Sequence, residues 1–245
     1  MKLDLNADVG EGMASDAALL GIVSSANIAC AAHAGDESVM RQAVAACLQN
    51  GVGIGAHPGY ADRENFGRLP QALTQNEVIA LVADQTRLLE RIALQGGGKL
   101  RHVKPHGALS NQAMHDFELA QAIAEAIASV SPQLIFLAPS GSAMAQAGRE
   151  AGLVVVQEIF ADRAYDDQGF LVPRNLPGAV LHDASHIADR LLNWLKTGKI
   201  MSASGRPLAL EAQSVCVHGD TPESVAIALH LQNRLLEAGV TLAPF

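Results

Sequence analysis

The chain has 245 residues, of which 49% are hydrophobic and 4% aromatic, and its formal net charge is −8. Such a length suits one α/β barrel, so we expect a single domain over residues 1–245. The acidic balance, with scattered Lys and Arg, argues against a nucleic-acid partner, which needs a basic surface. No stretch approaches the roughly 18 apolar residues of a membrane span, and the charged N-terminus lacks the apolar core of a signal peptide. The three cysteines show no paired spacing, which is typical of a cytoplasmic protein in a reducing compartment.

Strand-like apolar runs and amphipathic stretches alternate along the chain. Strands are predicted at residues 2–8, 26–33, 52–57, 100–105, 133–138, 153–160 and 213–218. Helices are predicted at residues 14–24, 37–49, 74–95, 115–129, 142–151, 182–197 and 221–238. Thr74 with Glu77 three residues later is a capping-box signature at the start of the third helix. Seven strands that each lead into a helix predict a parallel sheet closed by helices.

Three segments interrupt this alternation. Residues 58–73 and 160–181 are long, follow strands, and are rich in Gly, Pro, Asp and Arg, which is typical of lids or binding loops. Residues 199–210 carry two apolar arms around Ser204-Gly205 and predict a β-hairpin. A short eighth strand is predicted at Val240–Ala243.

Most predicted strands end in polar residues able to do chemistry. Side chains alternate between the two faces of a strand, so Asp4, Asn6 and Asp8 share one face and should point into the barrel. The same parity directs inward the groups His33, His57, Lys104 and His106, and His218 and Asp220. Interior Ala29, Ala31, Gly53 and Gly55 should leave room for a polar cavity. These strand ends predict one site assembled from the whole chain.

Two chemistries compete for these groups. Asp8, His33 and His57 are suited to bind a divalent metal such as zinc or manganese with an open water position. Alternatively, the same groups act as general acid and base without metal, while Lys104 and Arg63 or Arg68 hold an anion. Asp4 has a structural alternative, an ion pair with Lys104 across the barrel.

Nucleotide binding has no clear motif. Gly96-Gly97-Gly98-Lys99 lacks the P-loop spacing and precedes a strand rather than a helix. Ser140 within Pro139-Ser140-Gly141-Ser142 stands at a helix start, where free N–H groups favour an anion. His182 and His186 are interpreted as surface residues at the start of a helix.

The chain resembles the LamB/YcsF family over essentially its whole length. The resemblance is carried by blocks in the family's order, namely DLNADVGEG (4–12), NIACAAHAGD (27–36), GAHPGY (55–60) through FGR (66–68), VKPHGAL (103–109), EIFADRAY (158–165), LVPR (171–174) and CVHGD (216–220). Two positions depart from the family pattern. Ala31-Ala32 replaces Gly-Phe before His33, and Ser110 replaces a Tyr, so two aromatic positions near the mouth are changed.

The resemblance implies a fold, an activity and site residues. The implied fold is a distorted seven-stranded (β/α) TIM-like barrel of the glycoside hydrolase/deacetylase type. The implied activity is ATP-dependent hydrolysis of 5-oxo-L-proline (pyroglutamate) to L-glutamate with two partner subunits, B and C, and with magnesium accompanying ATP. The catalytic candidates are Asp8, His33, His57, Lys104, His106, Glu158 and His218. The candidates for binding substrate or phosphate are Asn6, Glu11, Asp36, Arg63, Arg68, Ser140, Asp162, Arg163 and Asp220.

One route for this reaction phosphorylates the lactam oxygen before water attacks the activated carbon, with Asp8 or Glu158 as the base. Two other interpretations of the same polar cavity remain open. In the first, the chain is a 5-oxoproline-binding subunit without chemistry of its own. In the second, it is a stand-alone metal-dependent amide hydrolase.

Overall fold

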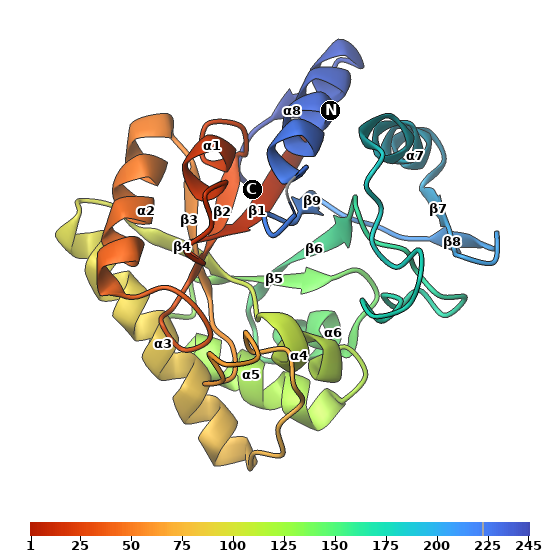
Figure 1. The fold of residues 1–245 in the computed structure, drawn as a ribbon. Coiled ribbons are helices and arrows are strands. Elements are labelled where there is room, and N and C mark those ends of the chain that lie inside the picture. The colour runs from red at the N-terminus through yellow and green to blue at the C-terminus, as the bar shows by residue number, and fades with distance from the viewer. Residues whose placement is uncertain (222) are drawn as a thin grey trace.

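Seven parallel strands close into a barrel in the computed structural model, which describes residues 1–221 and 223–245 (Figure 1). The barrel strands are β1 (Lys2–Val9), β2 (Ser25–Ala29), β3 (Gly53–His57), β4 (Leu100–Val103), β5 (Ile135–Pro139), β6 (Val154–Phe160) and β9 (Ser214–Val217). They are paired in this order, and β9 also pairs with β1, which closes the ring. The predicted seven-stranded barrel is confirmed.

Helices surround this barrel (Figure 1). They are α1 (Asp16–Leu19), α2 (Glu37–Asn50), α3 (Gln75–Gln95), α4 (Gly107–Ala113), α5 (Phe117–Val130), α6 (Ala143–Glu150), α7 (Ala184–Thr197) and α8 (Ser224–Glu237). Thr74 caps α3 with the reciprocal Thr74–Glu77 bonds of a capping box, as predicted. The outward-facing Leu3, Leu5 and Val9 of β1 are buried in the core that the helices cover.

The barrel interior is polar and partly filled. Asp4, Asn6 and Asp8 are buried with Asn27, Ser214 and other inward-facing polar groups, as strand parity predicted. The expectation that Gly55 leaves room for the cavity is wrong. A Cβ on Gly55 would lie 2.0 Å from Nε2 of His102, so the imidazole already fills that space.

Three local predictions differ from the structure. Only Asp16–Leu19 is helical within 14–24, where the Asp16 carboxylate accepts a hydrogen bond from the Gly10 amide and the chain turns into β2 soon after. The second strand ends at Ala29, and Ala31 adopts a left-handed φ of 65°, so His33 lies in a loop. Helix α4 was not predicted. It begins directly after His106 because Gly107, at φ 53°, turns the chain out of the strand direction.

The remaining strands lie outside the ring. Strands β7 (Lys199–Met201) and β8 (Pro207–Ala209) form the predicted antiparallel hairpin. Strand β10 (Thr241–Leu242) pairs in parallel with Lys2 and Leu3, which brings the two termini to one end of the barrel (Figure 1). Within the described residues, the helices are too short or too polar to cross a membrane.

Candidate active site

A cavity of about 630 Å³ opens at the carboxyl ends of the barrel strands. Its floor is formed by residues at the ends of β1, β3, β4 and β9, namely Asp8, His57, Lys104, His106 and His218. The wall comes from helix α4 and from the loop after β6, with Ser110, Met114, Phe170 and Arg174 among its residues. Carboxyl ends of parallel strands meet at one face, which is why residues far apart in sequence share this cavity.

Lys104 is the centre of the floor. Its Nζ lies 3.0 Å from Oδ1 of Asp8, 3.2 Å from Oε2 of Glu158 and 3.0 Å from Sγ of Cys216. Burial alone would lower the pKa of Lys104, but Asp8 and the other acceptors hold it well above its ordinary value. Burial likewise works to raise the pKa of Asp8, yet His57 and Lys104 hold it well below the usual range. An ammonium and a carboxylate therefore stand side by side in the floor.

Glu158 and Asn6 lie behind the floor rather than in the cavity lining. Asn6 donates to Oε2 of Glu158 at 3.2 Å and to Oγ of Ser214 at 2.7 Å. Glu158 is 1% exposed, and burial raises its pKa although Lys104 acts in the opposite direction. The structure thus makes Glu158 a buried partner of Lys104.

Asp4 is not paired with Lys104, so that structural alternative is wrong. Its carboxylate instead accepts hydrogen bonds from the hydroxyls of Ser24 and Ser25, both at 2.7 Å, and of Ser214. Hydroxyl donors satisfy a buried carboxyl without a counter-ion, and burial raises the pKa of Asp4.

Three histidines and Glu11 gather beside Asp8. Nε2 of His57 lies 3.5 Å from Oδ2 of Asp8 and 3.0 Å from Nδ1 of His106. The ring of His33 stacks on His106 with centroids 3.8 Å apart, and its two nitrogens have no hydrogen-bond partner among the described residues. Oε1 of Glu11 lies 3.7 Å from Nδ1 of His106, and burial, followed by the charge of Asp8, raises the pKa of Glu11 to about 8.

Arginines dominate one side of the mouth. Asp220 accepts hydrogen bonds on Oδ2 from Arg68 at 2.5 Å and from Arg174 at 2.8 Å, which joins the loop after β3 to the loop after β6. Arg163 also lines the cavity, and its guanidinium donates to the carbonyl oxygens of Ala179 and Val172. Burial, followed by the charge of Arg174, lowers the pKa of Arg163 to about 10. This side of the cavity is suited to receive an anion.

His218 completes the floor on the β9 side. Its ring Nδ1 lies 2.9 Å from Oδ1 of Asp162, which is itself outside the cavity lining. The backbone amide of His218 donates to the same carboxylate at 3.2 Å. Although burial works to raise it, this histidine holds the pKa of Asp162 below its ordinary value. Asp162 therefore orients His218, leaving the other ring nitrogen to the cavity.

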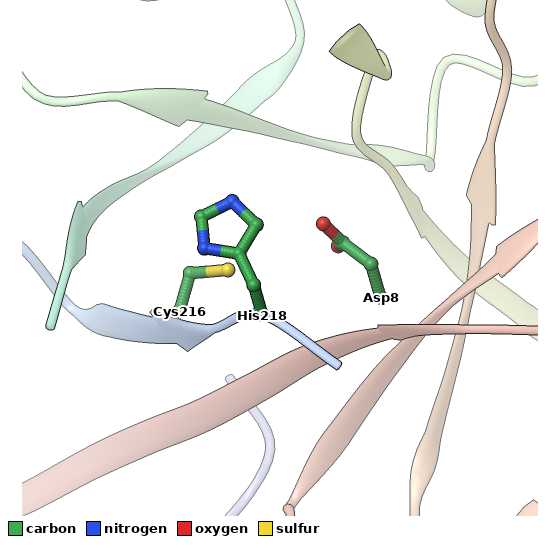
Figure 2. A group of neighbouring side chains, drawn as sticks. All are labelled: Asp8, Cys216 and His218. Carbon is green, nitrogen blue, oxygen red and sulfur yellow. The ribbon is translucent and has the colours of Figure 1, made fainter. Parts of the chain in front are cut away.

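Among the described residues, two groups of side chains place three possible ligand atoms within 4.8 Å of one another. In the first, Asp8 and His218 rise from β1 and from the end of β9 into the same space as the sulfur of Cys216 (Figure 2). Nζ of Lys104 already lies 3.0 Å from both Asp8 and Cys216, and a metal ion there would repel this ammonium. Burial also raises the pKa of the Cys216 thiol well above its ordinary value, whereas metal ligation needs the thiolate. This group does not fit a metal.

The second group is Glu11, His33 and His106. The His33 and His106 rings are parallel to within 2° and stacked, so their in-plane lone pairs run side by side and do not meet at one ion. The predicted trio of Asp8, His33 and His57 does not form such a group within the described part of the chain. Its members are separated because His33 faces Glu11, with 3.9 Å between Nε2 and Oε1.

Five of the predicted binding residues lie outside the cavity lining, and besides Asn6 and Asp162 these are Asp36, Arg63 and Ser140. Asp36 caps helix α2 by accepting from the Val39 amide, and Arg63 donates to the carbonyl oxygens of Ala31 and Gly35. The Ser140 amide donates to the Glu158 carbonyl, while Ser142 caps α6. The structure therefore does not place Asp36, Arg63 and Ser140 where a ligand in this cavity would meet them. His182 and His186 are exposed, as predicted.

Several residues of the lining were not predicted from the sequence. Arg174 lies in the long loop after β6 and binds Asp220, and His115 lies beside Phe170 with ring centroids 3.7 Å apart. The length of residues 160–181 and the block LVPR (171–174) were the available signals for Arg174. His115 had none, because it follows the unpredicted helix α4.

Fold and cavity together define a TIM-like barrel protein with a cavity lined by acidic and basic side chains at the carboxyl ends of its strands. The chain belongs to the LamB/YcsF family, whose sequence pattern matches residues 3–245. It is 48% identical to the A component of 5-oxoprolinase from Nitrobacter winogradskyi, over 100% of this chain and 98% of that protein. It is 47% identical to the A component of 5-oxoprolinase from Rhodopseudomonas palustris, over 100% and 99% of the two chains.

Solved structures support the same fold. The lactam utilization protein from Thermus thermophilus is 38% identical, with a TM-score of 0.93 over 100% of both chains. The catalytic domain of a peptidoglycan N-acetylglucosamine deacetylase from Eubacterium rectale is 10% identical, with a TM-score of 0.54 over 99% of this chain and 87% of that one. The second likeness concerns the fold alone, and it agrees with the predicted deacetylase-type barrel.

Proposed function

We propose that this chain opens the ring of 5-oxo-L-proline to give L-glutamate, as one subunit of an ATP-dependent 5-oxoprolinase. The observation that carries the proposal is the cavity, which combines an ion-paired acid–base floor with an arginine-rich wall. The names of its relatives, a 5-oxoprolinase component and a lactam utilization protein, support the substrate class. A volume of about 630 Å³ accommodates a small cyclic amide together with water.

The substrate carboxylate is bound at the wall. Arg68 and Arg174 share one carboxylate oxygen of Asp220, so further N–H groups of both guanidinium forks are available to a second anion. With its carboxylate at this wall, the lactam ring extends toward the floor, where Asp8, His57 and Lys104 line the cavity. Arg174 thus joins Arg68 as a substrate-binding residue.

Asp8 acts as the base toward the attacking water. It lines the cavity and is held ionised by His57 and Lys104, whereas Glu158 is enclosed behind Lys104. The positive charge of Lys104 favours the negative charge that develops on the lactam oxygen or on a phosphoryl group there. The protons of its ammonium already face Asp8, Glu158 and Cys216, so Lys104 acts through its charge and through Asp8.

Hydrolysis of ATP provides the free energy for the reaction. A five-membered lactam is an unstrained amide, and phosphorylation of its oxygen turns that oxygen into a leaving group before water attacks. Magnesium accompanies ATP in this scheme, as is usual for phosphoryl transfer. The sequence of this chain has no P-loop, and its relatives are named as one component of the enzyme, which supports two further subunits, B and C, as partners.

Two other functions are less well supported. A subunit that only binds 5-oxoproline has no need of a buried lysine–carboxylate pair beneath the ligand, since burying such charges is costly. A stand-alone metal-dependent amide hydrolase requires converging ligands, and neither candidate group provides them, because one contains the Lys104 ammonium and the other has stacked imidazoles.

The test measures ATP-dependent glutamate release from 5-oxoproline by this chain, by subunits B and C, and by the full mixture. We expect turnover in the full mixture alone, and a decrease of about 10²- to 10⁴-fold when Asp8→Asn replaces the wild-type chain. His186→Ala, on the exposed surface of α7, is the matched control and should retain full turnover. Undiminished turnover with Asp8→Asn would make this chain a binding subunit.

A further inference from the structure

The outer nitrogens of two neighbouring imidazoles have fixed protonation. Nδ1 of His57 lies 2.7 Å from the carbonyl oxygen of Lys104, and Nε2 of His106 lies 2.9 Å from the carbonyl oxygen of Phe66. A carbonyl oxygen only accepts hydrogen bonds, so both of these nitrogens carry a proton. A neutral imidazole has a single N–H, and in each of these rings that N–H already donates to a backbone carbonyl oxygen.

The two inner nitrogens then face each other. Nε2 of His57 and Nδ1 of His106 are 3.0 Å apart, a normal hydrogen-bond separation. With both rings neutral, two bare lone pairs would meet at this distance in a buried site, with neither able to donate. A single additional proton turns the repulsion into a charge-assisted hydrogen bond.

We propose that His57 and His106 hold one extra proton between them, as an imidazolium–imidazole pair that supplies the proton to the lactam nitrogen. This inference rests on the proposed function and specifies which group of the site is its acid. Both rings line the cavity, so the pair can reach a bound substrate.

The surroundings place the charge on His57. Nε2 of His57 lies 3.5 Å from the ionised Asp8, while burial, followed by the charge of His57, lowers the pKa of His106 to about 3. His33, which stacks on His106, is neutral because burial lowers its pKa. Glu11, with its pKa raised to about 8, is largely protonated at neutral pH.

The nearest carboxylate agrees with this assignment. Asp8, which is held ionised, lies 3.5 Å from Nε2 of His57 and 3.0 Å from Nζ of Lys104. Glu158 lies 3.2 Å from the same ammonium, on the side away from the cavity lining. The negative charge of Asp8 beside His57 therefore favours the extra proton on Nε2 of His57.

The protons that the site donates and accepts are equal in number over one ring opening. In the phosphorylated lactam, water adds its oxygen to the ring carbon and gives a proton to Asp8, while the ring nitrogen takes the proton of the pair. The carbon–nitrogen bond breaks as the new hydroxyl gives its proton to the same nitrogen, which leaves the carbon as an acyl phosphate. A second water then hydrolyses this acyl phosphate to the carboxylate and inorganic phosphate. Asp8 then returns its proton to His57 across their 3.5 Å contact, which restores the pair. The ring-opening step therefore consumes one water and needs no other proton source.

Histidine ¹⁵N and ¹H NMR on the ring-labelled chain tests the proton count directly. At neutral pH we expect His57 to carry protons on both ring nitrogens, and His106 on Nε2 alone. In His106→Phe the imidazolium signal of His57 should be lost at neutral pH, whereas His106→Asn, which retains an accepting oxygen, should preserve part of it. His186→Ala serves to assign the exposed imidazole and should leave the pair unchanged.

Other spectra would overturn the proposal. Single protonation of both rings at neutral pH excludes the pair. Stoichiometric binding of Zn²⁺ or Mn²⁺ by the wild-type chain, lost in both His57→Asn and His106→Asn, would instead make these nitrogens metal ligands. Calorimetric titration with each ion measures this binding without any activity assay.

Kinetics separates the failure of this inference from that of the proposed function. In the mixture with subunits B and C, His57→Asn keeps a donor for the Lys104 carbonyl but loses the acid, so kcat should fall about 10²- to 10⁴-fold with little change in KM. If NMR shows the imidazolium–imidazole pair but the mixture with subunits B and C releases no glutamate, the proposed function is wrong and the pair stands. If His57→Asn retains full turnover, the role of the pair as the acid is wrong and the proposed function stands.

Discussion

Lys104 is paired with Asp8 across the floor of the barrel, with 3.0 Å between Nζ and Oδ1. The lysine comes from the end of β4 and the aspartate from β1, and Glu158 of β6 contacts the same ammonium at 3.2 Å. One buried ammonium is therefore shared by two carboxyl groups from different strands. Replacing Lys104 should therefore affect stability as well as catalysis.

Lys104→Met should lower the free energy of unfolding by about 3–5 kcal/mol, because Asp8 and Glu158 then both lose the buried ammonium that they contact. Adding Glu158→Gln should restore part of the loss, since it removes one of the two charges. Urea denaturation measures both effects, with Lys196→Met on the exposed side of α7 as the control. A loss below about 1 kcal/mol in Lys104→Met would show that the carboxylates are neutral without the lysine.

Gly55→Ala should destabilise the fold through overpacking. The new Cβ would lie 2.0 Å from Nε2 of His102, a ring that is fully buried and held by Asn27 at 2.8 Å. The expected cost is about 1–3 kcal/mol or more, measured as a shift in the urea midpoint. Gly21→Ala, where the nearest atom is at 3.4 Å and φ is ordinary, should change stability by less than about 0.5 kcal/mol.

Acid should destabilise the protein in part through His102. Burial lowers the pKa of His102 from 6.5 to about 3, so the unfolded chain binds a proton between these pH values and the folded chain does not. The contribution of His102 to stability is complete above pH 6.5 and decreases as the pH falls, by about 1.4 kcal/mol per pH unit.

Replacing His102 isolates this effect. The plot of unfolding free energy against pH should be less steep in His102→Gln, by about half a proton at pH 6.5 and about one proton at pH 5. The same substitution at the exposed His186 should leave the slope unchanged. Parallel slopes for His102→Gln and the wild type would mean that His102 accepts a proton inside the barrel.

Arg174→Met should weaken substrate binding more than it slows the chemical step. A charged hydrogen bond contributes about 1.5–3 kcal/mol, so KM for 5-oxoproline should rise about 10- to 100-fold with a smaller change in kcat. Arg68→Met should act in the same direction because both guanidinium groups meet at Asp220. Arg206→Met on the exposed hairpin is the control, and an equal KM for Arg174→Met and wild type would remove Arg174 from the binding wall.

Much of the fold follows from local sequence. In the described part of the chain, the alternation of apolar runs and amphipathic stretches predicted each barrel strand and seven of the eight helices, and Thr74 with Glu77 marked the start of α3. Helix α4 escaped prediction because its seven residues are too few to show a clear period, and its start depends on the backbone turn at Gly107.

The site, like the fold, was predicted from the sequence only in part. Strand parity predicted that Asp8, His57, Lys104 and His218 point toward one cavity. Strand parity predicts which face of the sheet a side chain is on, but not whether the side chain reaches the cavity. It therefore did not distinguish Asp8, which lines the cavity, from Glu158, which lies behind Lys104. The predicted site also included Ser140, Arg63 and Asp36, although their contacts are with backbone groups outside it.

The sequence by itself determined the barrel, its polar interior and the identity of the groups at its mouth, because period and strand polarity are local properties of the chain. Only the tertiary structure decided which of those groups meet. Lys104 pairs with Asp8 and Glu158 rather than Asp4, and Nε2 of His57 faces His106. Such pairings depend on strand register and on distances of a few ångströms between residues about 50 to 150 positions apart, and short-range pattern does not encode them.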